Sequence, residues 1–157
     1  MKIALIYLQG RASNWAEFAS KEYEQKVSAI LPFEQVAIRS PSRGRQQADK
    51  KRDEEGLALL KFLKESSDKL ILFEEGGLEV SDSKEFSRFV VQKIALGGRL
   101  VFAIGGPYGF SLAVKRRALA TVSLSRLTFN HHLARVVALE QIYRALTIWR
   151  GLPYHNE

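Results

Sequence analysis

One stretch of the chain has residue types that could hold a small molecule: "IGGPYGFS", residues 104–111, where glycines and a proline follow an apolar run. One interpretation is a tight turn, because glycine tolerates positive φ angles and proline fixes its own φ. The other is a ligand cradle, in which missing Cβ atoms let backbone N–H and C=O groups approach a ligand. Such a cradle would lie at the carboxyl end of a parallel strand, where α/β sheets bind ligands.

Other motifs of catalysis are missing from the sequence. The glycine stretch matches neither the phosphate-binding pattern G-x-x-x-x-G-K-[ST] nor the dinucleotide-binding pattern G-x-G-x-x-G. The first apolar run ends in a single glycine, Gly10, which argues against a Rossmann-type site there. His131 and His132 are adjacent and cannot both face one ion from a helix, and no carboxylates cluster with them. We therefore expect no metal site. The sequence also lacks the nucleophile-elbow motif of serine hydrolases, so we expect no Ser-His-Asp catalytic site.

Apolar runs that alternate with helical periods predict the framework around the glycine stretch. The expected strands are residues 2–8, 33–38, 69–74, 99–104 and 121–124. We expect an α/β fold in which helices flank a parallel sheet and every strand is buried on both faces. Because parallel strands end at the same edge, the glycine stretch would lie beside two other strand exits.

Capping residues and glycine stops predict the helices between these strands. Asn14 with Glu17 has the spacing of a capping box and begins one helix. Asp82 with Glu85 repeats that spacing, and Ser111 can cap a short helix. The expected helices cover residues 14–30, 46–65, 82–96, 112–119 and 133–149, with a turn at residues 74–77 and a loop at residues 125–132.

The last expected helix has an unusually wide apolar stripe, at positions 133, 136, 137, 139, 142, 143, 146 and 149. One core-facing side does not require this width, so either the domain covers both sides or a partner subunit covers one. Because terminal helices usually lie at the surface, we favour a homodimer buried around this helix. Glu140 and Arg144 stand four residues apart on it and are interpreted as a surface ion pair.

Composition restricts the class of protein and its partners. The 157 residues fit a single domain, residues 1–157, that can bury a core without a disulfide, and the chain has no cysteine. No apolar run is long enough for a signal or membrane segment, so we expect a cytoplasmic protein. The formal net charge of +7 argues for an anionic partner, although charge alone leaves nucleic acid undecided. Cations are concentrated in one stretch: Arg39, Arg43, Arg45, Lys50, Lys51 and Arg52.

Several ordered blocks carry a family resemblance. "IGGPYG", "LSRLTFNHHLARVVALEQIYRA" and the terminal "PYH" resemble the ribosomal RNA large subunit methyltransferase H family, a group of minimal SPOUT enzymes. "KIALIYLQG" and "DEEG" are also in register, so the resemblance covers essentially the full length. It implies an α/β domain with a C-terminal trefoil knot, a homodimer and no accessory RNA-binding domain.

The resemblance implies an S-adenosylmethionine-dependent enzyme, with S-adenosylhomocysteine as the product. The implied acceptor is N3 of a pseudouridine in large-subunit rRNA, methylated on assembled ribosomes. The cations from Arg43 to Arg52 would then meet rRNA phosphates as a group, although each alone could be solvated. One alternative is a non-catalytic ribosome-binding module of the same fold. A more distant alternative is an α/β enzyme acting on a phosphorylated small molecule.

By resemblance, three strand exits line the cofactor pocket, with the residues Phe73, Gly105, Leu124, Ser125, Arg126, Leu127, Thr128 and Phe129. The candidates on the RNA side are His131, Arg144, Tyr154 and His155, the last two delivered by the partner's tail. His155 could take or relay a proton, Tyr154 could stack on the base, and Arg144 could offset negative charge. The alternatives are a loop histidine at 131 and a frayed tail after the last helix.

Overall fold

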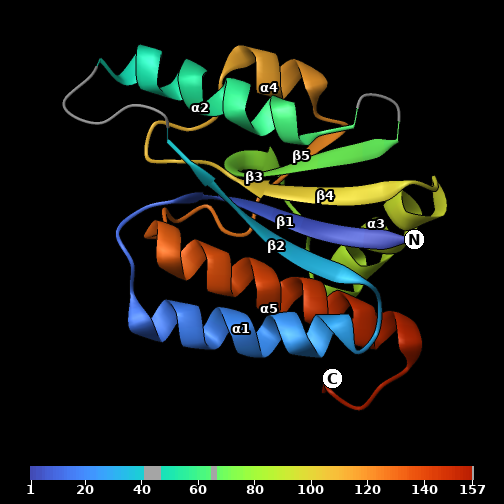
Figure 1. The fold of residues 1–157 in the computed structure, drawn as a ribbon. Helices are drawn as coiled ribbons and strands as arrows, with labels where there is room; N and C mark the ends of the chain where they lie inside the picture. Colours follow the sequence, from blue (N-terminus) through green and yellow to red (C-terminus); the bar gives the residue numbers. More distant parts are fainter. Residues whose placement is uncertain (41–46, 65–66, 157) are drawn as a thin grey trace.

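Five apolar runs form the strands of one parallel sheet (Figure 1). The structure is a computed structural model that describes residues 1–40, 47–64 and 67–156. In these residues the strand order is β2-β1-β4-β3-β5, and every neighbouring pair is parallel. The strands are β1 (Lys2–Gln9), β2 (Phe33–Arg39), β3 (Asp68–Leu78), β4 (Arg99–Ile104) and β5 (Ala120–Val122). The expected α/β class with a parallel sheet is confirmed.

Helices cover both faces of the sheet (Figure 1). One face carries α1 (Asn14–Ser28), α3 (Ser83–Ala95) and α5 (His131–Arg150), and the other carries α2 (Ala48–Phe62) and α4 (Leu112–Arg117). The expected ends of α2 at residues 46 and 65 lie outside the described residues. Among the helices of the described segments, none has the length and apolar character that a membrane crossing requires.

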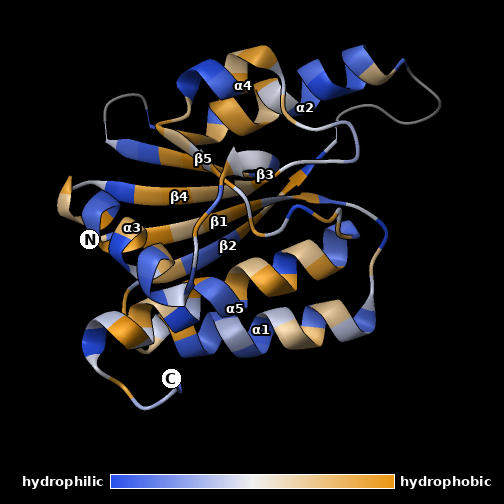
Figure 2. Ribbon diagram, turned by 180° about the vertical axis from the view of Figure 1, so that it is seen from behind, coloured by the Kyte–Doolittle hydropathy of each residue, from blue (hydrophilic) through white to orange (hydrophobic). Residues whose placement is uncertain are grey.

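Successive side chains on a strand point to opposite faces of the sheet, so the sheet separates two hydrophobic cores. On β1, Ile3 and Leu5 pack with α1, α3 and α5, whereas Ala4 and Ile6 pack with α2 and α4. Figure 2 shows β1 and β4 largely in hydrophobic colours, as strands buried on both faces require. The expectation of full burial is wrong for β2, where only Ile38 is buried. As an edge strand, β2 has a neighbour on one side only.

β3 continues through the turn expected at residues 74–77. Its pairing with β5 shifts register between Phe73 and Leu78, and the Ser123 amide donates to the Leu78 carbonyl at 2.9 Å. A Cβ on Gly77 would lie 2.7 Å from the backbone nitrogen of Val122, so only glycine fits this close approach. Gly77 therefore lets the backbones of β3 and β5 meet, and the chain does not reverse direction here.

The helix starts follow the capping prediction in part. The Asp82 carboxylate accepts from the Glu85 amide at 2.7 Å, and Ser111 caps α4 by accepting from the Val114 amide at 3.3 Å. The capping box at Asn14 is wrong, because Ser13 is the N-cap of α1 and Asn14 is already helical. α5 begins two residues earlier than expected because the Asn130 side chain accepts from the His132 amide at 2.9 Å.

The chain itself covers most of the apolar stripe of α5. Leu139, Ile142 and Leu146 are fully buried, since α5 packs against the sheet, α1 and α3. The width of the stripe therefore follows from contacts within one chain. Apolar surface remains next to it on α1, where Trp15 is 54% and Phe18 is 77% exposed.

We predict that Gly77→Ala lowers the free energy of unfolding by about 1–3 kcal/mol, because the new methyl group meets β5 backbone. Gly76→Ala is the matched control on the same strand, since a Cβ there has no neighbour within 4 Å. Urea unfolding of the two variants and the wild type measures the difference. Equal stabilities of both variants would contradict the close approach of β3 and β5.

Candidate functional site

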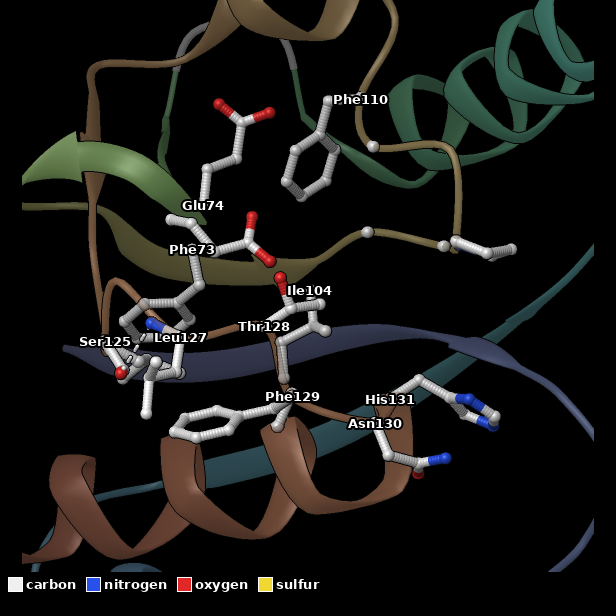
Figure 3. A pocket seen from close by; sticks show the side chains of 17 residues that line it. Phe73, Glu74, Ile104, Phe110, Ser125, Leu127, Thr128, Phe129, Asn130 and His131 are labelled. Carbon is white, nitrogen blue, oxygen red and sulfur yellow. Dashed lines mark hydrogen bonds between the residues drawn. The ribbon is translucent and has the colours of Figure 1, made fainter.

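A pocket of about 390 Å³ lies at the carboxyl edge of the sheet (Figure 3). Three segments form it: residues 73–75 of β3, where its pairing with β4 ends, the glycine loop after Ile104, and the loop from Leu124 into α5. Most of its side chains are apolar, including Leu127 and Phe129. The pocket is where the sequence predicts that three strand exits meet.

The glycine loop is both a tight turn and a wall of this pocket. The Gly109 amide donates to the Gly106 carbonyl at 3.0 Å, and Gly109 has a φ of 75°. Behind the loop, a Cβ on Gly106 would lie 2.8 Å from Glu55 Oε2 and 3.0 Å from Leu8 Cδ1. The loop is therefore packed from behind, and its missing side chains leave backbone exposed toward the pocket.

Two carboxylates in the pocket wall were not assigned a role from the sequence. Glu74 Oε1 lies 3.1 Å from Lys115 Nζ of α4, which neutralises that charge. Glu75 is exposed and makes no ion pair with other described residues. Acidic residues at a strand exit are the signal that could have pointed to them. Glu75 therefore gives an otherwise largely apolar pocket one negatively charged side, which favours a cationic ligand.

Most of the residues predicted to bind a cofactor line this pocket: Phe73, Gly105, Leu124, Ser125, Leu127, Thr128 and Phe129. Arg126 does not. Its side chain is 82% exposed, and its Nε lies 3.1 Å from Glu79 Oε1.

His131 lies in the pocket wall at the start of α5. A Cβ on Gly10 would lie 2.8 Å from His131 Nε2, so the imidazole rests against the exit of β1. Burial, followed by the nearby His132, lowers the pKa of His131 below its usual 6.5. The neutral imidazole therefore predominates at neutral pH, and it offers one nitrogen as an acceptor.

Glu140, Arg144, Tyr154 and His155 form a C-terminal cluster at the other end of α5. Arg144 donates to Glu140 Oε1 from Nε at 3.0 Å, and the Tyr154 hydroxyl donates to the same oxygen at 3.1 Å. Arg144 Nη1 lies 3.2 Å from His155 Nδ1. The predicted ion pair between Glu140 and Arg144 is confirmed, but it is partly buried, and Glu140 also connects Arg144 to Tyr154.

The tail after α5 is ordered in this arrangement. Gly151 ends the helix with a φ of 65°, and the Leu152 amide donates back to the Thr147 carbonyl at 2.9 Å. The Tyr154 ring packs on Tyr143 with the ring centroids 4.7 Å apart. Burial, then the hydrogen bonds with Tyr23 and Glu140, raise the pKa of Tyr154, so its phenol stays protonated.

One chain does not bring the pocket and the C-terminal cluster together. His131 and Arg144 stand 13 residues apart on α5, which is about 20 Å at ~1.5 Å per residue. Figure 1 shows the tail of the chain at the end of α5 that faces away from the glycine loop. The four RNA-side candidates therefore divide between the two ends of one helix.

The basic stretch is only partly within the described residues. Arg43 and Arg45 lie outside them. Arg52 Nη2 lies 2.9 Å from Asp49 Oδ1, and Lys51 Nζ is 6.0 Å from the centroid of the Tyr108 ring.

Over the described ranges, no group of three or more His, Asp or Glu side chains could hold a metal ion.

Comparison with known proteins gives a consistent match. A family model described as "Predicted SPOUT methyltransferase" matches residues 1–155. Two relatives named "Ribosomal RNA large subunit methyltransferase H" come from Bdellovibrio bacteriovorus and Cytophaga hutchinsonii. The first is 39% identical over 157 residues, 99% of both chains. The second is 41% identical over 157 residues, covering 99% of this chain and 100% of its own. A relative of the same name from Porphyromonas gingivalis is 40% identical over the full length of both chains.

We predict that His132→Gln raises the pKa of His131 toward 6.5, because the repulsion between the two imidazoles is lost. Any reaction that needs neutral His131 would then lose activity at a higher pH than in the wild type. An NMR titration of the histidine rings measures the pKa directly, with His155 as the internal reference. An unchanged pKa of His131 would show that His132 does not affect it.

Proposed function

The chain belongs to the SPOUT methyltransferase family, and from this premise we propose that it transfers a methyl group from S-adenosylmethionine to large-subunit ribosomal RNA. The observation that carries the proposal is the pocket between the glycine loop and the loop that enters α5. The specific acceptor that we propose is N3 of a pseudouridine on the assembled ribosome. This activity would take place in the cytoplasm, where ribosomes are.

The pocket residues fit the proposed donor. Phe73, Leu124 and Phe129 offer apolar surface for an adenine ring, and the glycine loop offers backbone groups for its polar edge. The carboxylate of Glu75 is available to a positively charged sulfonium compound. When bound, S-adenosylmethionine supplies an electrophilic methyl group. The chain's own contribution is to hold the donor and to manage the proton of the acceptor.

We assign proton acceptance to His131 instead of His155. Arg144 can only donate a hydrogen bond, so His155 Nδ1 is the acceptor in their contact. A neutral His155 ring then carries its proton on Nε2, and neither nitrogen is free to accept a proton from the base. The His131 imidazole makes no hydrogen bond to any described residue, and its lowered pKa keeps it neutral. It can therefore accept the N3 proton of a base held beside the pocket. Tyr154 then serves to contact the base, and Arg144 offsets the negative charge of the surrounding RNA.

A second copy of the chain would bring the C-terminal cluster to the pocket. Trp15 and Phe18 of α1 are exposed, and the Trp15 ring centroid lies 6.4 Å from that of His132 in the first turn of α5. Leu133 of α5 is 42% exposed. A partner that covers this apolar surface lies next to His131, which supports a homodimer with shared sites. The trefoil knot that the resemblance implies stays a prediction.

Thr128→Trp is expected to abolish donor binding, because the indole would fill the pocket that the exposed Thr128 lines. Arg126→Trp is the matched control on the same loop, since the side chain of Arg126 points out toward Glu79. Calorimetric titration with S-adenosylmethionine compares the two variants. Loss of binding in both or in neither would contradict this pocket, and no binding by the wild type would favour a non-catalytic module.

Mixed dimers test whether the tail acts on the partner's pocket. A chain that ends at Gly151 keeps the pocket but lacks Tyr154 and His155, and Thr128→Trp keeps the tail but lacks the pocket. Each variant alone is expected to be inactive. An equal mixture should regain about a quarter of wild-type activity, since about half of the dimers are mixed and each has one complete site. Mass spectrometry of the rRNA measures methylation, and no recovery would place the tail on its own chain's site.

A further inference from the structure

A second cavity, of about 260 Å³, adjoins the proposed donor pocket. Most of it is lined by residues 7–12, which are the end of β1 and the segment that follows it, and by the first turns of α5. Ile104, Gly105 and His131 line both cavities, so only these residues separate a ligand in one from a ligand in the other. In Figure 3 the His131 ring points away from Phe73 and Phe129 of the donor pocket.

The strand register explains why the two cavities are neighbours. Ile104 of β4 pairs with Tyr7 on one side and with Phe73 on the other. The donor pocket lies on the Phe73 side of Ile104, and the second cavity lies on the Tyr7 side. The sheet thus places two binding spaces side by side at its carboxyl edge, the arrangement that a transfer between two substrates requires.

The charged groups of the second cavity differ in whether they are already paired. Arg135 is 5% exposed, and its guanidinium lies 3.7 Å from the Tyr7 ring centroid. It donates to Glu17 at 2.7 Å and to Gln35 at 2.8 Å. Arg11, in contrast, is exposed and makes no ion pair or hydrogen bond with the described residues through its side chain. Arg135 therefore builds the wall, and Arg11 remains an available cation.

We propose that the second cavity binds the nucleotide that accepts the methyl group, with its base against His131 and its phosphate at Arg11. This inference rests on the proposed function, because it takes the neighbouring pocket to hold the donor. The cavity has the volume of about nine water molecules at ~30 Å³ each, which is enough for one pyrimidine ring.

The hydrogen-bonding groups around the cavity suit a uracil-type base. Such a base has an N–H donor between two carbonyl acceptors, and the neutral His131 offers the matching acceptor. The Gln9 side-chain oxygen accepts from Arg39 Nε at 3.2 Å, which leaves the amide NH₂ of Gln9 to donate to a base carbonyl. Cytosine has no N–H at its N3 position. Its N3 is a hydrogen-bond acceptor and cannot donate to the acceptor nitrogen of His131. With the acceptor nitrogen of His131 toward the base, the cavity is expected to favour uridine or pseudouridine over cytidine.

The test combines binding of a free nucleotide with kinetics on ribosomes. In donor-free wild-type protein, pseudouridine 5′-monophosphate should shift the NMR signals of the Gly10 amide and the His131 ring. Cytidine 5′-monophosphate should shift them less, and Ala12→Trp, which fills the cavity, should abolish the shifts. Circular dichroism confirms that this variant is folded.

Arg11→Ala should raise the KM for ribosomes about tenfold, as expected for loss of one charge-assisted hydrogen bond, and leave donor affinity unchanged. Arg11→Lys should recover most of the loss. Arg88→Ala removes the same charge from the exposed surface of α3 and should change KM less than about twofold.

Equal KM values for Arg11→Ala and Arg88→Ala would overturn the proposal, as would nucleotide shifts that spare Gly10 and His131 or the absence of any shift. These results would leave the proposed function intact if the wild type still binds the donor and methylates rRNA. Failure of the wild type in those two assays would instead remove the proposed function.

Discussion

Parallel pairing of the central strands is the constraint on which the rest of the molecule depends. It aligns Tyr7, Ile104 and Phe73 in one row across β1, β4 and β3, at the edge where β4 ends and its pairing with both neighbours stops. The segments that follow these strands must therefore leave the sheet side by side. Glycines at two of these exits let the backbone and His131 pack closely, and the space between the loops becomes the two cavities.

α5 connects this edge of the sheet to the opposite end of the molecule. Its first turn carries His131 into the walls of both cavities, and its last turns hold Arg144, Tyr154 and His155 around Glu140. Burial of the central part of α5 against the sheet, α1 and α3 fixes both ends with respect to the core. A helix that is straight and packed along its length cannot bring its two ends together. The proposed second copy solves this problem because it places one chain's tail beside the other chain's pocket.

Much of the fold could be predicted from the sequence, because apolar runs, the Asp82 cap and the glycine stops are local signals. The meeting of three strand exits also followed from the parallel sheet. The sequence does not reveal the role of Gly77, because a glycine that permits a turn and one that permits close approach have the same sequence signal. The sequence also does not reveal the burial of Glu140, because helical spacing shows its partner Arg144 but not the tail that folds over both. The outward direction of Arg126 depends on loop geometry, which its neighbours in sequence do not determine.

The central claim is that the glycine loop and the loop into α5 hold the methyl donor on the Phe73 side of Ile104. A crystal structure of the protein with S-adenosylhomocysteine, the product of the proposed donor, tests it most directly. The account predicts electron density for the adenosine between Gly105 and Phe129, with the cavity on the Tyr7 side left free for the acceptor. Density on the Tyr7 side, or none in a crystal grown with saturating ligand, would contradict it.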